Sequence, residues 1–154
     1  MTNKWHKRFF EIAKCVSTWS KDPSTQIGAV IVDNNRRILS TGYNGFPRNI
    51  DDKSELYLNR EIKYQYILHA EINALFNALY NGVSVKNSIM YVWGLPMCSE
   101  CAKGIIQSGI LEVYWSIDDK KQIPEKWIES FKLTEKLFNK ASIIFKNINY
   151  EKLT

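Results

Sequence analysis

The run Ile27-Gly28-Ala29-Val30-Ile31-Val32 is short, almost continuously apolar and rich in β-branched residues, which predicts a strand buried on both faces. Asp33-Asn34-Asn35 supplies a tight turn, and the segment Arg37 to Tyr43 is a second strand candidate, so the two segments predict a hairpin. The chain has 154 residues, of which 45% are hydrophobic and 24% charged. That composition is typical of one globular domain, and we expect residues 1–154 to form it.

Upstream of the hairpin, apolar residues at spacings of three and four predict a helix near residues 4–19 that ends before Asp22-Pro23; its stripe is Trp5, Phe9, Ile12, Val16 and Trp19. Downstream, residues 44–66 are irregular. A helix should then start near His69 and stop at Asn81-Gly82, with a predicted buried face of Ile72, Leu75, Phe76 and Leu79.

The rest of the chain alternates between strand and helix patterns. Strands are expected at 88–93, 111–115 and 142–145, and helices from Cys98 to Ser108-Gly109 and over 125–139. Together with the hairpin, this order predicts an α/β fold of three layers, α/β/α, with a central mixed sheet of five strands. Ligands in such sheets gather where strands end and helices begin.

Composition also bounds the location and the ligand. No secretory signal and no apolar run of roughly 20 residues is visible, so we expect a soluble, cytoplasmic protein with no membrane partner. Three cysteines, two of them close together, suit metal binding in a reducing compartment better than a disulfide framework. The formal net charge of +5 favours an anionic ligand such as a nucleotide, although the basic residues are spread along the chain.

Cys98 and Cys101 are one helical turn apart at a predicted helix start, where the thiolate forms that bind metal are favoured. His69 begins another helix. If the two helix starts are neighbours, the three side chains form a zinc site with one open position, which is typical of a catalytic zinc ion.

Other readings of these residues are open. A lone C-x-x-C motif also suits redox chemistry or a structural metal, and a histidine at a helix start also serves as a cap. A structural zinc site would need a fourth protein ligand. The candidates are poor, because we expect Cys15 to be a buried small apolar residue and His6 to lie near a mobile terminus.

Glu71 is the candidate for the group that transfers protons in a catalytic zinc site. Zinc bound by two thiolates and a neutral imidazole has no net formal charge, so it polarises a bound water less than a site of three neutral histidines would. A carboxylate directed at the open position could take a proton from the water and deliver it to a substrate ring nitrogen and then to a departing amine.

His69-Ala70-Glu71, followed by Pro96-Met97-Cys98-Ser99-Glu100-Cys101-Ala102, resembles the cytidine and deoxycytidylate deaminase superfamily and its H-x-E and P-C-x-x-C signature. Met97 departs from the signature by separating the proline from the first cysteine. We expect this insertion to change the start of the helix locally and to leave zinc binding intact. Further similarity to the deoxycytidylate branch covers most of residues 5–116, in the segments 20–29, 41–47, 64–73 and 100–110.

The resemblance implies hydrolysis of dCMP to dUMP and ammonia, which supplies thymidylate synthesis. It implies that Asn44 and the Ala70 backbone contact the base or sugar, and that Lys21, Ser24 and Thr25 lie near the phosphate. It also implies a homo-oligomer, for which a hexamer is our expectation. Asn44-Gly45 and Asp22-Pro23-Ser24-Thr25 are also ordinary turn sequences.

Many relatives bind a dCTP or dTTP effector through Gly-Cys-Ser-Asp-Asp, where this chain has Arg48-Asn49-Ile50-Asp51-Asp52. Arg48, Asp51 and Asp52 are therefore candidates for binding an effector or a phosphate, with Mg²⁺ as a companion of the nucleotide. Two competing functions stay open: a nucleic-acid deaminase resembling the tRNA adenosine editors, and a zinc-binding module without catalysis. We do not expect a nucleic-acid partner, because no basic groove with stacking aromatics is apparent.

Overall fold

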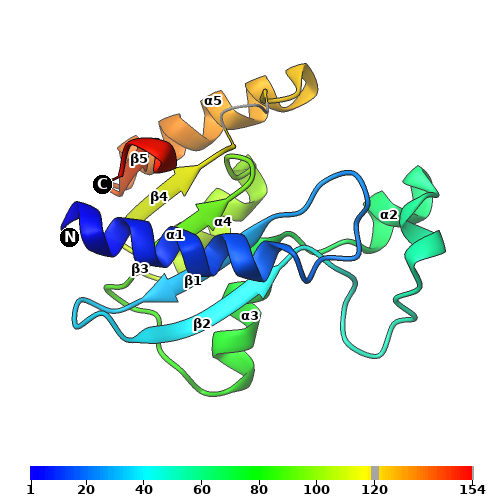
Figure 1. The fold of residues 1–154 in the computed structure, drawn as a ribbon, viewed down its shortest axis with the longest axis horizontal. Helices are drawn as coiled ribbons and strands as arrows, with labels where there is room; N and C mark the ends of the chain where they lie inside the picture. The colour runs from blue at the N-terminus through cyan, green and yellow to red at the C-terminus, as the bar shows by residue number, and fades with distance from the viewer. Residues whose placement is uncertain (119–121, 154) are drawn as a thin grey trace.

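The computed structural model describes residues 1–118 and 122–153 and has three layers, with helices on both faces of a central sheet (Figure 1). The elements in chain order are α1 Asn3–Ser17, β1 Gly28–Val32, β2 Ile38–Tyr43, the 3-10 turn η1 Ser54–Tyr57, α2 Arg60–Tyr66, α3 Ala70–Tyr80, β3 Ile89–Trp93, α4 Ser99–Gln107, β4 Glu112–Ser116, α5 Glu125–Lys140, β5 Ile144–Asn147 and the 3-10 turn η2 Tyr150–Lys152. The predicted α/β/α architecture is confirmed.

The sheet is mixed, with the strand order β2-β1-β3-β4-β5. β1 pairs antiparallel with β2, as the predicted hairpin requires, and antiparallel with β3 on its other side. β3, β4 and β5 are parallel, so the helices α4 and α5 both begin beyond the same edge of the sheet, where β3 and β4 end. That edge is where ligands bind in open α/β sheets.

Two apolar cores fill the spaces between the layers. α1 and the C-terminal segment cover one face, where Phe9 and Phe10 of α1 pack against Tyr91 of β3. α3, α4 and α5 cover the other face, where Met90, Val92 and other strand residues pack against helix alanines and Ile105. Because β1 and β3 are buried along their whole length, their sequences are continuously apolar instead of alternating.

The sequence pattern assigned the buried face of α3 only partly correctly. Ile72 and Leu75 are partly buried and pack against the core, but Phe76 and Leu79 are 46% and 74% exposed. The fully buried residues of the inner face are Ala70, Ala74 and Ala78. The small alanine side chains let α3 lie close to the sheet, and Phe76 and Leu79 of the predicted stripe are left exposed. Trp19, predicted in the stripe of the first helix, lies beyond the end of α1 and is 55% exposed.

The segment expected to be irregular contains η1 and the short helix α2. Asn59 caps α2 by accepting hydrogen bonds from the backbone of Glu61 and Ile62. The backbone of Gly45 pairs with that of Leu68 through N–H to O distances of 3.1 and 2.8 Å, which fixes the Asn44 loop beside the residue preceding His69. Within the described ranges, no helix is long and apolar enough to cross a bilayer.

Gly42 permits the closest contact between β2 and α3. A Cβ at position 42 would lie 2.3 Å from the Ala74 nitrogen and 2.4 Å from the Ala70 oxygen, both of them backbone atoms. Three side-chain hydrogen bonds join the same two elements: Ser40 donates to Ala74, Asn73 to Tyr43 and Asn77 to Thr41. The position of α3, and with it that of His69 and Glu71, therefore depends on position 42 having no side chain.

We expect Gly42→Ala to lower the free energy of unfolding by about 3 kcal/mol, because backbone atoms cannot move aside as a flexible side chain would. Urea denaturation of the zinc-loaded protein measures the change. Gly45→Ala is the matched control, since its added Cβ would meet side-chain atoms at an ordinary distance of 3.6 Å. Equal unfolding midpoints for the two variants would show that the contact at Gly42 is not tight.

Candidate active site

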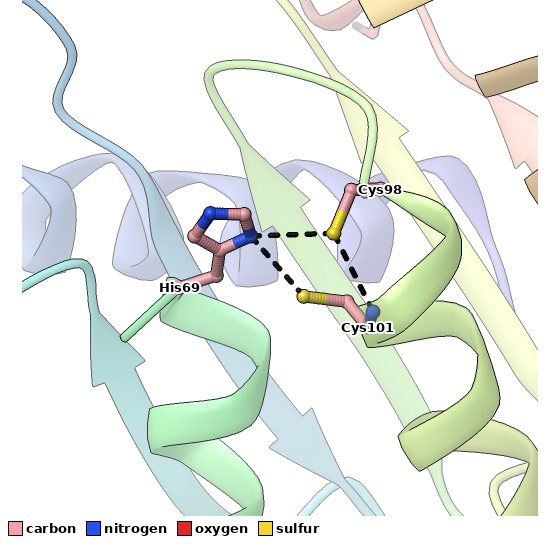
Figure 2. A group of neighbouring side chains, drawn as sticks. All are labelled: His69, Cys98 and Cys101. Atoms are coloured by element: carbon pink, nitrogen blue, oxygen red, sulfur yellow. Dashed lines mark hydrogen bonds between the residues drawn. The ribbon is translucent and has the colours of Figure 1, made fainter. Parts of the chain in front are cut away.

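His69, Cys98 and Cys101 come together between the N-termini of α3 and α4 (Figure 2). His69 is the N-cap of α3 and Cys98 the N-cap of α4, where the Cys98 sulfur accepts a hydrogen bond from the Cys101 backbone at 3.5 Å. Each sulfur lies 3.4 Å from the His69 Nδ1 atom. The predicted proximity of the two helix starts is therefore present, and the ligand atoms all lie within 4.8 Å of one another.

The spacing of these atoms fits a zinc ion. A tetrahedral zinc with ordinary bond lengths to nitrogen and sulfur places those two atoms roughly 3.5 Å apart. A hydrogen bond from Cys101 lowers the pKa of the Cys98 thiol to about 4, and the bond to Cys98 raises the pKa of His69 to about 9. Hydrogen bonding with Cys98 and burial raise the pKa of Cys101. A metal ion binds thiolates and a neutral imidazole, so it would displace the protons of this cluster.

Neither candidate for a fourth ligand reaches the cluster. His6 is a buried residue of α1, with its Nδ1 atom 3.0 Å from the Tyr91 hydroxyl, so the expectation of a mobile terminus there is wrong. Cys15 is exposed, which corrects the expectation that it is buried. In the part of the chain that the structure describes, the group of possible ligands has three members, which leaves a fourth coordination position open.

Glu71 lies in the first turn of α3, beside the cluster, and is 2% exposed. Burial raises the pKa of its carboxyl group, although the nearby His69 acts in the opposite direction. A buried acid with a raised pKa that lines the same cavity as His69 and Cys98 is suited to accept and return a proton near neutral pH.

A cavity opens beside the cluster. Three residues that the resemblance placed at the ligand, Thr25, Asn44 and Ala70, line it, whereas Lys21 and Ser24 do not. Lys21 instead forms an ion pair with Asp52 at 3.0 Å. The Ala70 N–H belongs to the first helical turn, whose N–H groups have no acceptor within the helix and are available to a ligand.

Asn44 ties together the loops around the cavity. Its side-chain oxygen accepts from the Ile27 backbone at 2.8 Å, and its nitrogen donates to the Thr25 carbonyl at 2.8 Å. The buried Ser20 hydroxyl donates to the Asn44 carbonyl at 2.7 Å. Asn44 therefore shapes the wall of the cavity through the protein itself, and a direct contact with a ligand stays a prediction.

The structure adds residues that the sequence patterns did not select: Lys63 and Tyr64 of α2, and Lys126 and Trp127 of α5, all line the cavity. Lys63 and Asp22 form a buried ion pair at 2.7 Å. Burial alone would raise the pKa of Asp22, but hydrogen bonds from Lys63 and Ser24 hold it below its ordinary value. The sequence did predict a helix starting at residue 125. Because that helix follows β4, its first turn could have been expected beyond the C-terminal ends of β3 and β4, close to the cluster.

Met97 does not disturb the cluster. Its side chain is buried in the core below α4, and its carbonyl accepts a hydrogen bond from the buried Thr134 hydroxyl of α5 at 3.1 Å. Cys98 still caps α4, and both sulfurs still face His69 (Figure 2).

A second cavity lies on the outer side of α3 and is lined by Arg48 and Asp52 among other residues. Arg48 hydrogen-bonds the Asn77 side chain, and its guanidinium carbon lies 4.4 Å from the centre of the Tyr80 ring. Asp52 accepts from the Tyr57 hydroxyl at 2.5 Å, and Asp51 pairs with Lys53 at 3.2 Å outside the cavity lining.

Comparison with known proteins agrees with this geometry. Residues 3–117 match the family described as the cytidine and deoxycytidylate deaminase zinc-binding region. A deaminase of uncharacterised function encoded in the luxG 3′ region of Aliivibrio fischeri is 41% identical over 143 residues, which cover 93% of this chain and 92% of that protein. The human deoxycytidylate deaminase is 37% identical over 150 residues, which cover 93% of this chain and 79% of the human one.

A solved structure has the same fold. The dCMP deaminase of the cyanophage S-TIM5, solved in complex with dCMP and dUMP, superposes with a TM-score of 0.73 at 22% identity, over 96% of this chain and 99% of that one. A three-layer fold with a His-Cys-Cys cluster at the edge of its sheet defines a class, the zinc-binding deaminases. Within that class, the chain belongs to the cytidine and deoxycytidylate deaminase family.

Proposed function

We propose that the protein, acting as one deaminase domain over residues 1–154, converts dCMP and water to dUMP and ammonia. The observation that carries this function is the open three-ligand cluster with the buried Glu71 carboxyl beside it. The human deoxycytidylate deaminase, 37% identical, and a protein of Caenorhabditis elegans named probable deoxycytidylate deaminase, 35% identical, support the choice of dCMP as substrate. The product, dUMP, is the nucleotide from which thymidylate is made.

His69, Cys98 and Cys101 would hold the zinc ion, which when bound supplies positive charge that makes a water at the open position more acidic. Glu71 accepts a proton from the attacking water and passes it to the ring nitrogen of cytosine. A second proton passes through Glu71 to the departing amine, which leaves as ammonia. Ala70 offers its backbone N–H to the base, and Asn44 keeps the wall of the cavity in place beside it.

Two other functions are less well supported. A zinc-binding module without catalysis would have no use for an open position and a buried acid facing the same cavity. A nucleic-acid deaminase shares the zinc and the glutamate, so only its substrate separates it from our proposal.

Glu71→Gln should reduce dCMP turnover by about 10²–10⁴-fold while zinc stays bound, because the amide keeps the shape of the side chain but cannot carry the proton. Ammonia release and zinc content per chain measure the two effects. Equal turnover by the wild type and the variant would contradict the mechanism, and wild-type activity on an RNA hairpin without any on dCMP would favour the nucleic-acid deaminase.

Cys101→Ser should lose most of its zinc and its turnover, because the open site has only three protein ligands and a hydroxyl is a poor substitute for a thiolate. Cys15→Ser is the matched control: that thiol is exposed and lies outside the cluster, so the variant should keep about one zinc ion per chain. Zinc retained by Cys101→Ser at the wild-type level would show that the metal binds elsewhere.

We also propose a regulatory role for the second cavity, with dCTP or dTTP, accompanied by Mg²⁺, as the effector and Arg48 and Asp52 among its contacts. Asp51, outside the lining, would act through the loop. A homo-oligomer, with a hexamer as the expected form, also stays a proposal; the exposed Phe76, Leu79 and Tyr80 on α3 would suit contact with a second copy. A cytoplasmic location stays a prediction.

Addition of dCTP or dTTP should change dCMP turnover by the wild type, and Arg48→Ala should reduce that change, because it removes a cation from the second cavity. The ratio of turnover with and without effector is the measurement. Arg37→Ala is the control, since Arg37 pairs with Asp33 in the hairpin turn. A ratio of one for the wild type would exclude this regulation.

A further inference from the structure

One side of the substrate cavity is built by side chains from α2 and α5 that touch one another. The Lys126 ammonium donates a hydrogen bond to the Tyr64 hydroxyl at 2.7 Å and lies 5.1 Å from the centre of the Tyr64 ring. Both residues line the cavity, as does Trp127. The ammonium group lies 5.4 Å from the centre of the Trp127 ring.

Trp127 connects this pair to the metal-ligand cluster. Its ring centre lies 6.3 Å from that of His69, and the two rings meet edge to face. The Trp127 ring therefore contacts both the Lys126 ammonium and the His69 ring. A ligand whose base lies beside Glu71 has its remaining groups within reach of this side of the cavity.

Lys126 differs from the nearby lysines in having no acidic partner among the described residues. Lys63 also lines the cavity, but the buried Asp22 carboxylate neutralises its charge at 2.7 Å, and its ammonium donates a second hydrogen bond to the Ser24 hydroxyl at 2.8 Å. Lys21 points to Asp52 and lies outside the lining. Across residues 1–118 and 122–153, Lys126 has no acidic partner within 4.0 Å, so its charge is available to an anion.

The Tyr64 hydroxyl adds a donor beside that charge. Its oxygen accepts the hydrogen bond from Lys126 and, among the described residues, its own proton has no acceptor, so the hydroxyl can donate to an oxygen atom of a ligand. The same hydrogen bond lowers the pKa of Tyr64, which makes the hydroxyl a stronger donor. An ammonium and a hydroxyl side by side form a suitable pair of contacts for a phosphate.

We propose that Lys126 and Tyr64 bind the 5′-phosphate of the substrate and so make the enzyme prefer a nucleotide to a nucleoside. This inference rests on the proposed dCMP deamination. Lys126 lies outside residues 3–117, the segment that matches the family, so the preference for a phosphate would come partly from the C-terminal helix and not only from the shared catalytic segment.

Steady-state turnover of dCMP and of deoxycytidine by Lys126→Met tests the proposal. Methionine keeps the length of the side chain and removes the charge, so the KM for dCMP should rise about tenfold or more, and the preference for dCMP over deoxycytidine should fall by about the same factor. Tyr64→Phe should raise the KM for dCMP about threefold and lower the preference for dCMP over deoxycytidine by a similar factor. Lys136→Met is the control, because Lys136 is an exposed residue of the same helix outside the cavity lining.

A KM for dCMP that rises no more in Lys126→Met than in Lys136→Met would overturn the proposal, as would an equal loss with dCMP and deoxycytidine. Thermal unfolding of each variant checks that α5 is intact. Calorimetric binding of dUMP separates this inference from the proposed function. Weaker dUMP binding by Lys126→Met supports the phosphate contact even if the protein releases no ammonia from dCMP. Turnover of dCMP that does not depend on Lys126 supports the proposed deaminase function but contradicts the phosphate contact.

Discussion

The close packing of α3 against β2 is the constraint on which the site depends. The contact between Gly42 and the α3 backbone leaves no room for a methyl group, and the alanines along the inner face of the helix extend that contact. His69 and Glu71 sit at the N-terminal end of this helix. Their distance from Cys98 and Cys101 is therefore set by backbone packing, which is stiffer than any arrangement of long side chains.

The second half of the cluster is fixed by a different part of the sheet. α4 begins where β3 ends, and Cys98 caps it, so the two sulfurs lie where the parallel strands direct their helices. β1 pairs with both β2 and β3. The helix with His69 and Glu71 packs against β2, and the helix with the two cysteines follows β3, so β1 links the two halves of the site. A slip in the register of β1 against either neighbour would separate the histidine from the cysteines.

The sequence was sufficient to predict the sheet, the order of its elements and the pairing of His69 with the two cysteines, because these depend on apolar periodicity and on helix starts. It was misleading for Phe76, Leu79 and Cys15, since single apolar residues are also common on exposed helix surfaces and the close contact of α3 with β2 selects alanines for its inner face. Lys126 and Trp127 could not be found in this way, because their role depends on α5 lying beside α2, a contact between segments about 60 residues apart.

The ion pair of Asp22 and Lys63 gives the two lysines of the cavity different roles. A buried carboxylate without a cation would be strongly destabilising, so Lys63 is committed to holding Asp22, whose oxygen atoms in turn order the loop through Ser24 and Thr25. Because the charge of Lys63 is already neutralised by Asp22, binding a second anion would add little favourable energy. The exposed Lys126 is bonded only to a neutral hydroxyl among the described residues, so it gives up no ion pair when it binds an anion. The buried lysine therefore shapes the cavity, and the exposed lysine is the one that can respond to a ligand.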